Sequence, residues 1–143
     1  MMLFTQQPRC DSDTEVVEGN YFDKYRSKNP IHRDLMKRFL RDATSLIDRA
    51  SHGSILEVGC GPGDLAARVV EGDPDRYLGI DISTSQIAIA RRRYPHLRFD
   101  VASAYELPFP DDSFDVCIAC ELLEHLTHPA LAMIELARVS RAH

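Results

Sequence analysis

Several features are missing from the sequence, and each absence excludes a class of protein. No apolar run approaches the roughly 18 residues that a membrane-spanning helix needs. The first residues lack a basic segment followed by an apolar stretch, so no secretory signal is expected. No lysine follows Lys37, which excludes a P-loop lysine and a Tyr-x-x-x-Lys dehydrogenase pair from the rest of the chain. We therefore expect a cytoplasmic protein without a membrane span.

The spacing of the cysteines argues against a zinc site. The four cysteines are Cys10, Cys60, Cys117 and Cys120. Without a secretory signal, we expect them to be reduced thiols. Cys117 and Cys120 form a C-x-x-C pair, but a structural zinc site needs a second pair and none exists. We interpret this pair as core cysteines at the end of a buried strand.

The composition is that of one globular domain, with an uneven distribution of charge. The 143 residues are 44% hydrophobic and 27% charged, which excludes a disordered chain. The net charge of −5 makes nucleic acid an unexpected partner for the chain as a whole. Residues 24–49 nevertheless hold eight Lys or Arg and three Asp, whereas residues 100–124 hold seven acids and no base. The basic stretch is interpreted as a solvated helix face, or alternatively as a docking surface for an anionic substrate.

Apolar patterning predicts alternating strands and helices. Residues 1–29 show no clear period and are predicted to be a mobile lead-in, and residues 30–143 are predicted to form the domain. The predicted strands are 54–58, 76–81, 97–101 and 114–119, and the predicted helical segments are 31–50, 64–71, 83–94, 121–126 and 129–139. This order predicts an α/β fold, with a parallel sheet between helical layers as in a Rossmann-like sandwich.

A glycine-rich loop lies between the first predicted strand and the helix after it. Residues 57–64 read E-V-G-C-G-P-G-D, and Asp81 follows the last glycine by 18 residues, at the end of the second strand. Glycines allow backbone close to a ligand, and an acid at the next strand end can accept both hydroxyls of a ribose. The loop therefore predicts a nucleoside-bearing cofactor.

The spacing of this loop separates two kinds of cofactor. The dinucleotide fingerprint is G-x-G-x-x-G, whereas residues 59–63 form G-x-G-x-G with Glu57 two residues before the first glycine. A carboxylate at that place suits a cationic group better than a pyrophosphate. A dinucleotide-dependent oxidoreductase is thus the weaker alternative.

Five segments resemble the class I S-adenosylmethionine-dependent methyltransferases. Residues 55–63 (I-L-E-V-G-C-G-P-G) are similar to their first motif, and residues 79–83 (G-I-D-I-S) to their second. Residues 107–115 (L-P-F-P-D-D-S-F-D) resemble the signature of the ubiquinone/menaquinone-methyltransferase-like branch. Glu124-His125 and residues 135–139 (E-L-A-R-V) continue the resemblance.

The resemblance implies S-adenosyl-L-methionine as cofactor, S-adenosyl-L-homocysteine as product and a small-molecule methyl acceptor. The cofactor-binding residues that it implies are Glu57, Gly59, Cys60, Gly61, Gly63, Asp81, Ile82, Ser103, Ala104, Cys120 and Glu121. The glycines would pack against the methionyl part, with Glu57 near its ammonium. Asp81 would hold the ribose, Ile82 would cover the adenine, and the residues after the fourth strand would line the methionine end. Ser103 stands where many relatives carry an adenine-binding Asp.

The transfer expected from the resemblance is an in-line displacement at an O- or C-nucleophile, so it depends mainly on positioning. A general base would be His125, whose alternative interpretation is a surface or helix-capping histidine. Glu121, Glu124 and His125 have the i, i+3, i+4 spacing of one helical face. They are weak candidates for a metal site like that of metal-assisted 2′-O-methyltransferases, and our expectation is that no metal is bound.

The resemblance also implies a seven-stranded sheet of order 3-2-1-4-5-7-6, of which this sequence supplies four strands. We expect the fourth strand to be an exposed apolar edge that favours self-association. The alternative function is accordingly a truncated cofactor-binding module without independent catalysis.

Overall fold

A computed structural model describes residues 29–50, 53–70 and 73–141. Its four strands are β1 (Ile55–Val58), β2 (Tyr77–Asp81), β3 (Arg98–Val101) and β4 (Val116–Ile118). They form one parallel sheet in the order β3-β2-β1-β4, in which Glu57 of β1 lies opposite Gly79 of β2 and Ile118 of β4. The expected α/β fold and the order of its first four strands are confirmed.

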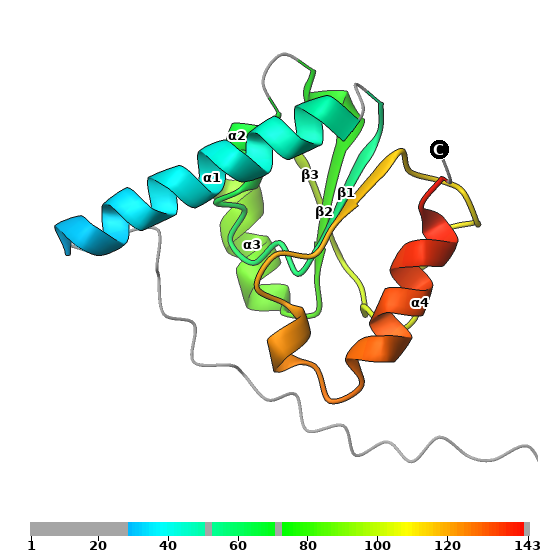
Figure 1. The fold of residues 1–143 in the computed structure, drawn as a ribbon. Helices are drawn as coiled ribbons and strands as arrows, with labels where there is room; N and C mark the ends of the chain where they lie inside the picture. The colour runs from blue at the N-terminus through cyan, green and yellow to red at the C-terminus, as the bar shows by residue number, and fades with distance from the viewer. Residues whose placement is uncertain (1–28, 51–52, 71–72, 142–143) are drawn as a thin grey trace, which may run out of the picture.

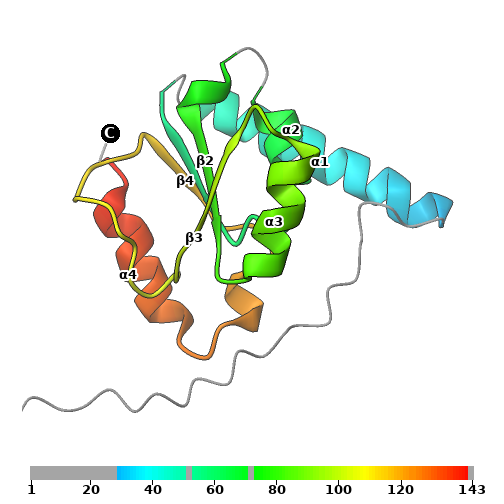
Figure 2. The ribbon, with the colours of Figure 1, turned by 180° about the vertical axis from the view of Figure 1, so that it is seen from behind.

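Helices cover both faces of the sheet. Helices α1 (Pro30–Ala50), α2 (Ala66–Val69) and α3 (Thr84–Arg93) lie on one face, and α4 (Pro129–Val139) lies on the other (Figures 1 and 2). Because side chains alternate along each strand, β1 supplies Ile55 to the first interface and Leu56 and Val58 to the second. Among the described residues, no helix has the length and apolar character of a membrane span.

The helix starts follow the sequence signals. Asn29 Oδ1 accepts from the Ile31 N–H at 2.9 Å before the first helix, and Ser83 Oγ accepts from the Gln86 N–H at 3.3 Å before α3. Proline occupies the first position of α1 and of α4.

Two helical predictions were too long. The helix predicted over 64–71 is α2, with only four residues, because the loop before it continues in turns through residue 65. The turn predicted over 121–126 is the 3₁₀ helix η3 (Leu123–His125). A further 3₁₀ helix, η2 (Pro74–Arg76), precedes β2. The lead-in predicted for residues 1–29 lies outside the described residues except for Asn29.

The outer edge of the sheet is less open than predicted at the start of β4. Phe114 forms an isolated parallel bridge with Ser140, in which the Phe114 N–H donates to the Val139 carbonyl at 2.9 Å and the Arg141 N–H donates to the Phe114 carbonyl at 2.8 Å. The chain after α4 therefore returns to the sheet beside Phe114. Along β4 itself, the described residues pair only with β1.

Candidate functional site

Loops from three strands meet at one end of the sheet. The glycine loop after β1, the turn after β2 and the segment around η3 after β4 all lie at the lower end in Figure 1. Because the strands are parallel, this is the edge formed by their carboxyl ends, where α/β folds bind ligands. Sequence reasoning placed its candidate residues at this edge.

The glycine loop has the backbone conformation that only glycine adopts at low cost. Gly59, Gly61 and Gly63 have φ values of 78°, 51° and 81°. Two of these positions are also tightly packed, since a Cβ on Gly59 would lie 2.9 Å from a methyl of Leu122 and one on Gly63 would lie 3.0 Å from the Phe99 ring. Packing within the protein thus requires Gly59 and Gly63, in addition to any role toward a ligand.

Asp81 connects the loop to the helix after β2. Its Oδ2 accepts from the Gly61 N–H at 2.9 Å, and its Oδ1 accepts from the Ser83 N–H at 2.8 Å. The Asp81 carbonyl also accepts from the Ala102 N–H at 3.1 Å, just after β3. An ionised carboxylate offers about four acceptor positions, so two remain for other donors. Asp81 therefore positions the loop and retains the capacity to bind a diol.

Glu57 is a carboxylate in the core beneath the loop. Its side chain is only 3% exposed, and its Oε2 accepts a hydrogen bond of 2.5 Å from the hydroxyl of the fully buried Tyr77. Burial raises the pKa of Glu57 to about 7, an effect that the charges of Asp64 and Asp81 increase and the Tyr77 hydrogen bond partly opposes. Burial likewise raises the pKa of the neighbouring Cys60 thiol well above its usual range. A cation placed beside Glu57 would stabilise its ionised form.

The segment after β4 closes the other side of the loop. Leu122 packs against Gly59, and Glu121 has a left-handed backbone with φ of 55°. Cys120 is half-buried, and burial together with the charges of Glu57 and Glu121 raises its pKa to about 11. Cys117 packs on the opposite face of the sheet, with the α4 cluster, so the two cysteines of the C-x-x-C do not face one site.

The side predicted to hold an adenine lies after β2 and β3. The side chain of Ile82 is 57% exposed, which leaves it available to cover a base. Ser103 is engaged locally, since its Oγ accepts from the Tyr105 N–H at 3.2 Å. Ala104 is half-buried against the cluster that α4 covers.

The predicted metal candidates do not share one helical face. Glu121 lies before η3 in the left-handed conformation, so only Glu124 and His125 belong to the 3₁₀ turn, and both are exposed. Within the described part of the chain, no group of three or more His, Cys, Asp or Glu is placed to hold a metal ion. The prediction that the three side chains share one helical face was wrong, because Glu121 has a left-handed backbone conformation and precedes the helical turn.

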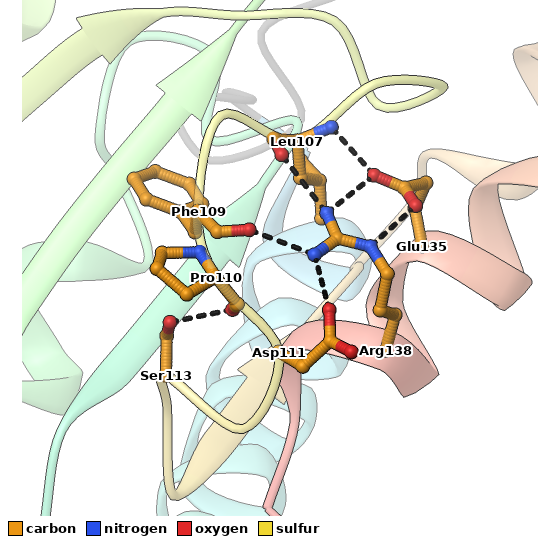
Figure 3. Close-up of polar contacts among 7 residues, drawn as sticks. All are labelled: Leu107, Phe109, Pro110, Asp111, Ser113, Glu135 and Arg138. Carbon is orange, nitrogen blue, oxygen red and sulfur yellow. Dashed lines mark hydrogen bonds and ion pairs between the residues drawn. The ribbon is translucent and has the colours of Figure 1, made fainter.

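Arg138 of α4 holds the segment between β3 and β4, a role that sequence reasoning did not assign. Its guanidinium donates to the carbonyls of Leu107 at 3.0 Å and Phe109 at 2.8 Å, and to Asp111 Oδ1 at 2.9 Å (Figure 3). It also forms two bonds with Glu135, at 2.7 and 2.8 Å, while Glu135 Oε2 accepts from the Leu107 N–H at 2.8 Å. We call Arg138 and its four partners the bracket. The resemblance between residues 107–115 and a family signature could have indicated it, because Leu107, Phe109 and Asp111 lie in that segment.

Replacing Arg138 by lysine is expected to lower the melting temperature by several degrees. An ammonium group cannot reproduce the planar fork that reaches two carbonyls and two carboxylates at once. Circular dichroism melting of Arg138→Lys would measure the change, with Arg92→Lys on the exposed face of α3 as the matched control. If both variants melt like the parent protein, the bracket contributes nothing to stability.

Comparison with known proteins identifies the family. A family model described as a methyltransferase domain matches residues 56–143. The chain belongs to the methyltransferase-domain family. The resemblance to class I S-adenosylmethionine-dependent methyltransferases that the motifs predicted is thereby confirmed.

Curated methyltransferases match most of the chain. The O-methyltransferase cnsE of Penicillium expansum is 34% identical over 140 residues, which cover 92% of this chain and 51% of the relative. The ubiquinone/menaquinone biosynthesis C-methyltransferase UbiE of Rickettsia massiliae is 36% identical over 115 residues, covering 69% of this chain and 44% of the relative. The chain thus spans about half the length of the curated methyltransferases it matches.

Solved structures agree on the fold. The [4+2]-cyclase SpnF has a TM-score of 0.62 at 31% identity, over 70% of this chain and 40% of that protein. The PH0226 protein of Pyrococcus horikoshii has a TM-score of 0.66 at 22% identity, over 87% of this chain and 59% of that protein. The first of these is described as a cyclase, so a methyltransferase-like fold by itself does not decide the chemistry.

Proposed function

We propose that the protein binds S-adenosyl-L-methionine and transfers its methyl group to an oxygen or carbon of a small-molecule acceptor. The observation that carries this proposal is the loop of three left-handed glycines fixed by Asp81, with the buried Glu57 beneath it. The family membership and the names of the curated relatives support it.

The residues present fit this cofactor. Asp81 keeps two acceptor positions for the ribose hydroxyls, and the exposed Ile82 next to it offers an apolar surface for the adenine. Glu57 would lie on the methionine side, where a positive charge would offset its burial. Cys120 and Glu121, just after β4, would line that side. Cys60, Ser103 and Ala104 would complete the proposed set.

Methyl transfer requires little of this chain beyond positioning the reacting groups. The bound cofactor supplies an activated methyl group on a sulfonium, and the acceptor attacks it in line. The loop and the segment after β4 would orient the reacting groups and exclude water from them. The exposed His125 is the local side chain able to accept a proton from an acceptor hydroxyl.

The second candidate function is a cofactor-binding module that does not catalyse transfer by itself. This alternative differs from the first in the acceptor contacts, which the relatives can carry in segments outside the match, since the match covers about half of each relative. An NAD-dependent oxidoreductase is the least supported reading, since the third glycine comes one residue early for that fingerprint.

Binding measurements separate these functions. Calorimetric titration is expected to show saturable binding of S-adenosylhomocysteine and no binding of NAD. Gly61→Val, which places a β-branched residue at a φ of 51°, is expected to abolish the binding of S-adenosylhomocysteine. Ala137→Val, an exposed position on α4, is the control that adds similar bulk away from the loop. NAD binding without S-adenosylhomocysteine binding would overturn the cofactor assignment, and binding without methyl transfer to a panel of phenols and quinols would favour the module.

Three further expectations stay proposals. We place the protein in the cytoplasm, and we treat residues 30–143 as one cofactor-binding domain after a lead-in of residues 1–29. We also propose that the protein self-associates through the exposed β4 edge. Support comes from the described residues of β4, which pair only with β1, while the one bridge on the other side lies before the strand, at Phe114.

A further inference from the structure

A cleft lies on the helical face of the protein, apart from the residues proposed to hold the cofactor. It has a volume of about 450 Å³ and lies between α1, α2 and the end of α3. The N-terminal half of α1 extends past the rest of the domain (Figure 1). Arg33, Met36, Lys37 and Leu40 of this half line the cleft. The cleft shares no residue with the cofactor set, although Asp64 at its rim directly follows Gly63. Its size suits a small organic molecule.

The lining of this cleft carries three cations and one acid. Arg33 and Lys37 of α1 and Arg68 of α2 line it, and all three side chains are exposed. Among the described residues, no carboxylate forms an ion pair with any of these three. The one acid in the lining, Asp64, pairs with Arg93 at 3.3 Å. Among the described residues, the cleft therefore presents three cations outside any ion pair, while its one acid is paired with a cation outside the lining.

The rest of the lining is apolar. Met36 and Leu40 come from α1, and the ring of Tyr94 comes from the residue after α3. Leu40 is buried, and Met36 and Tyr94 are half-buried against the same core cluster, so these walls are held in place by packing. Two other cations of α1 differ from those in the cleft, because each forms an ion pair. Arg38 pairs with Asp34 at 3.0 Å, and Arg41 pairs with Asp42 at 3.2 Å.

We infer that this cleft binds a small organic anion with an apolar body, such as an aromatic carboxylate. The three cations would hold the anionic group, and the apolar walls would contact the ring. The ligand has two conceivable sources, the methyl acceptor of the proposed reaction or a separate effector. This inference does not depend on the proposed function, because it rests on residues outside the cofactor site.

Titration with 2-naphthoate tests the cleft in the full chain. We expect saturable binding that weakens as salt is raised from about 0.05 to 0.5 M, because the attraction is screened. The double variant Arg33→Gln/Lys37→Gln is expected to weaken binding roughly tenfold, and Arg68→Gln from a different helix is expected to weaken it in the same direction. The control Arg38→Gln/Arg41→Gln removes two cations from the same helix outside the cleft and is expected to change the affinity less than about twofold.

Three results would overturn the inference. Unchanged affinity in both cleft variants would exclude these cations, and equal weakening in cleft and control variants would indicate only general charge attraction. Equal binding of the uncharged 2-naphthalenemethanol would show that the anion is not recognised. The two sources are distinguished by measuring the affinity of the cleft ligand with and without S-adenosylhomocysteine, a measurement that does not require methyl transfer. If the ligand is the methyl acceptor, it is expected to bind more tightly when S-adenosylhomocysteine is present. If it is an effector, S-adenosylhomocysteine is expected to change its affinity equally whether or not the ligand carries a methylatable group.

Discussion

Replacing Asp81 by alanine is expected to weaken the binding of S-adenosylhomocysteine by about a hundredfold. Loss of two hydrogen bonds from the ribose to a charged acceptor costs roughly 3 kcal/mol, which corresponds to this factor. A second effect acts in the same direction, because Asp81 also accepts from the Gly61 N–H at 2.9 Å and the Ser83 N–H at 2.8 Å. The variant loses both the ribose acceptor and the carboxylate that fixes the loop. Calorimetric titration measures the affinity.

Two further variants separate these effects. Asp81→Asn keeps one acceptor oxygen of similar position but no charge, so its affinity is expected to fall between those of the parent protein and of Asp81→Ala. Asp100→Ala removes an exposed carboxylate that bonds to Arg91 and not to the loop, and is expected to bind like the parent protein. Equal affinity of Asp81→Ala and Asp100→Ala would refute the role assigned to Asp81.

Replacing Glu57 by glutamine is expected to stabilise the protein at pH 8 by up to about 3 kcal/mol. The folded protein raises the pKa of Glu57 from 4.5 to about 7, so the folded state keeps a proton that the unfolded chain releases. The stability that the protonated Glu57 carboxyl contributes is therefore fully present below pH 4.5 and is lost as the pH rises through about 7. A shift of this size corresponds to roughly 3 kcal/mol. Glutamine stays neutral and can still accept from the Tyr77 hydroxyl.

The pH profile makes this prediction specific. Urea unfolding between pH 5 and pH 8 is expected to show falling stability in the parent protein and a flatter profile in Glu57→Gln. The carboxyl groups of Asp115 and Glu135 do not interfere, because their hydrogen bonds lower their pKa values to about 2 and their contributions change at more acidic pH. Glu106→Gln, at an exposed position, is the control. Identical profiles for the parent protein and Glu57→Gln would refute the raised pKa.

The order of elements and the cofactor loop could be predicted from the sequence because each leaves a local signal. Proline at the start of α1 and α4 and the glycine spacing after β1 identify their structures without any long-range contact. The acid at the end of β2 could be placed for the same reason, since parallel strands bring their carboxyl ends to one edge.

Other parts of the structure depend on contacts between residues far apart in the sequence, so they could not be predicted from local patterns. The partner of Glu57 is Tyr77, 20 residues away, and nothing in the local pattern of β2 indicates that its first residue turns its hydroxyl toward β1. The left-handed backbone at Glu121 was missed because a helical spacing of side chains does not reveal the φ of a single residue. The cleft combines α1, α2 and α3, so its residues become neighbours only in the folded protein.

The bracket formed by Arg138 also has a consequence for how the protein opens. It joins Leu107 to a residue 31 positions later, and thus closes a loop that contains β4, η3 and most of α4. Once these ends are held together, the entropy of closing the loop has already been lost, and the enclosed segments form at little further entropic cost. Partial unfolding is therefore expected to release β4, η3 and α4 as one cooperative unit, while β1, β2 and β3 with their helices stay folded.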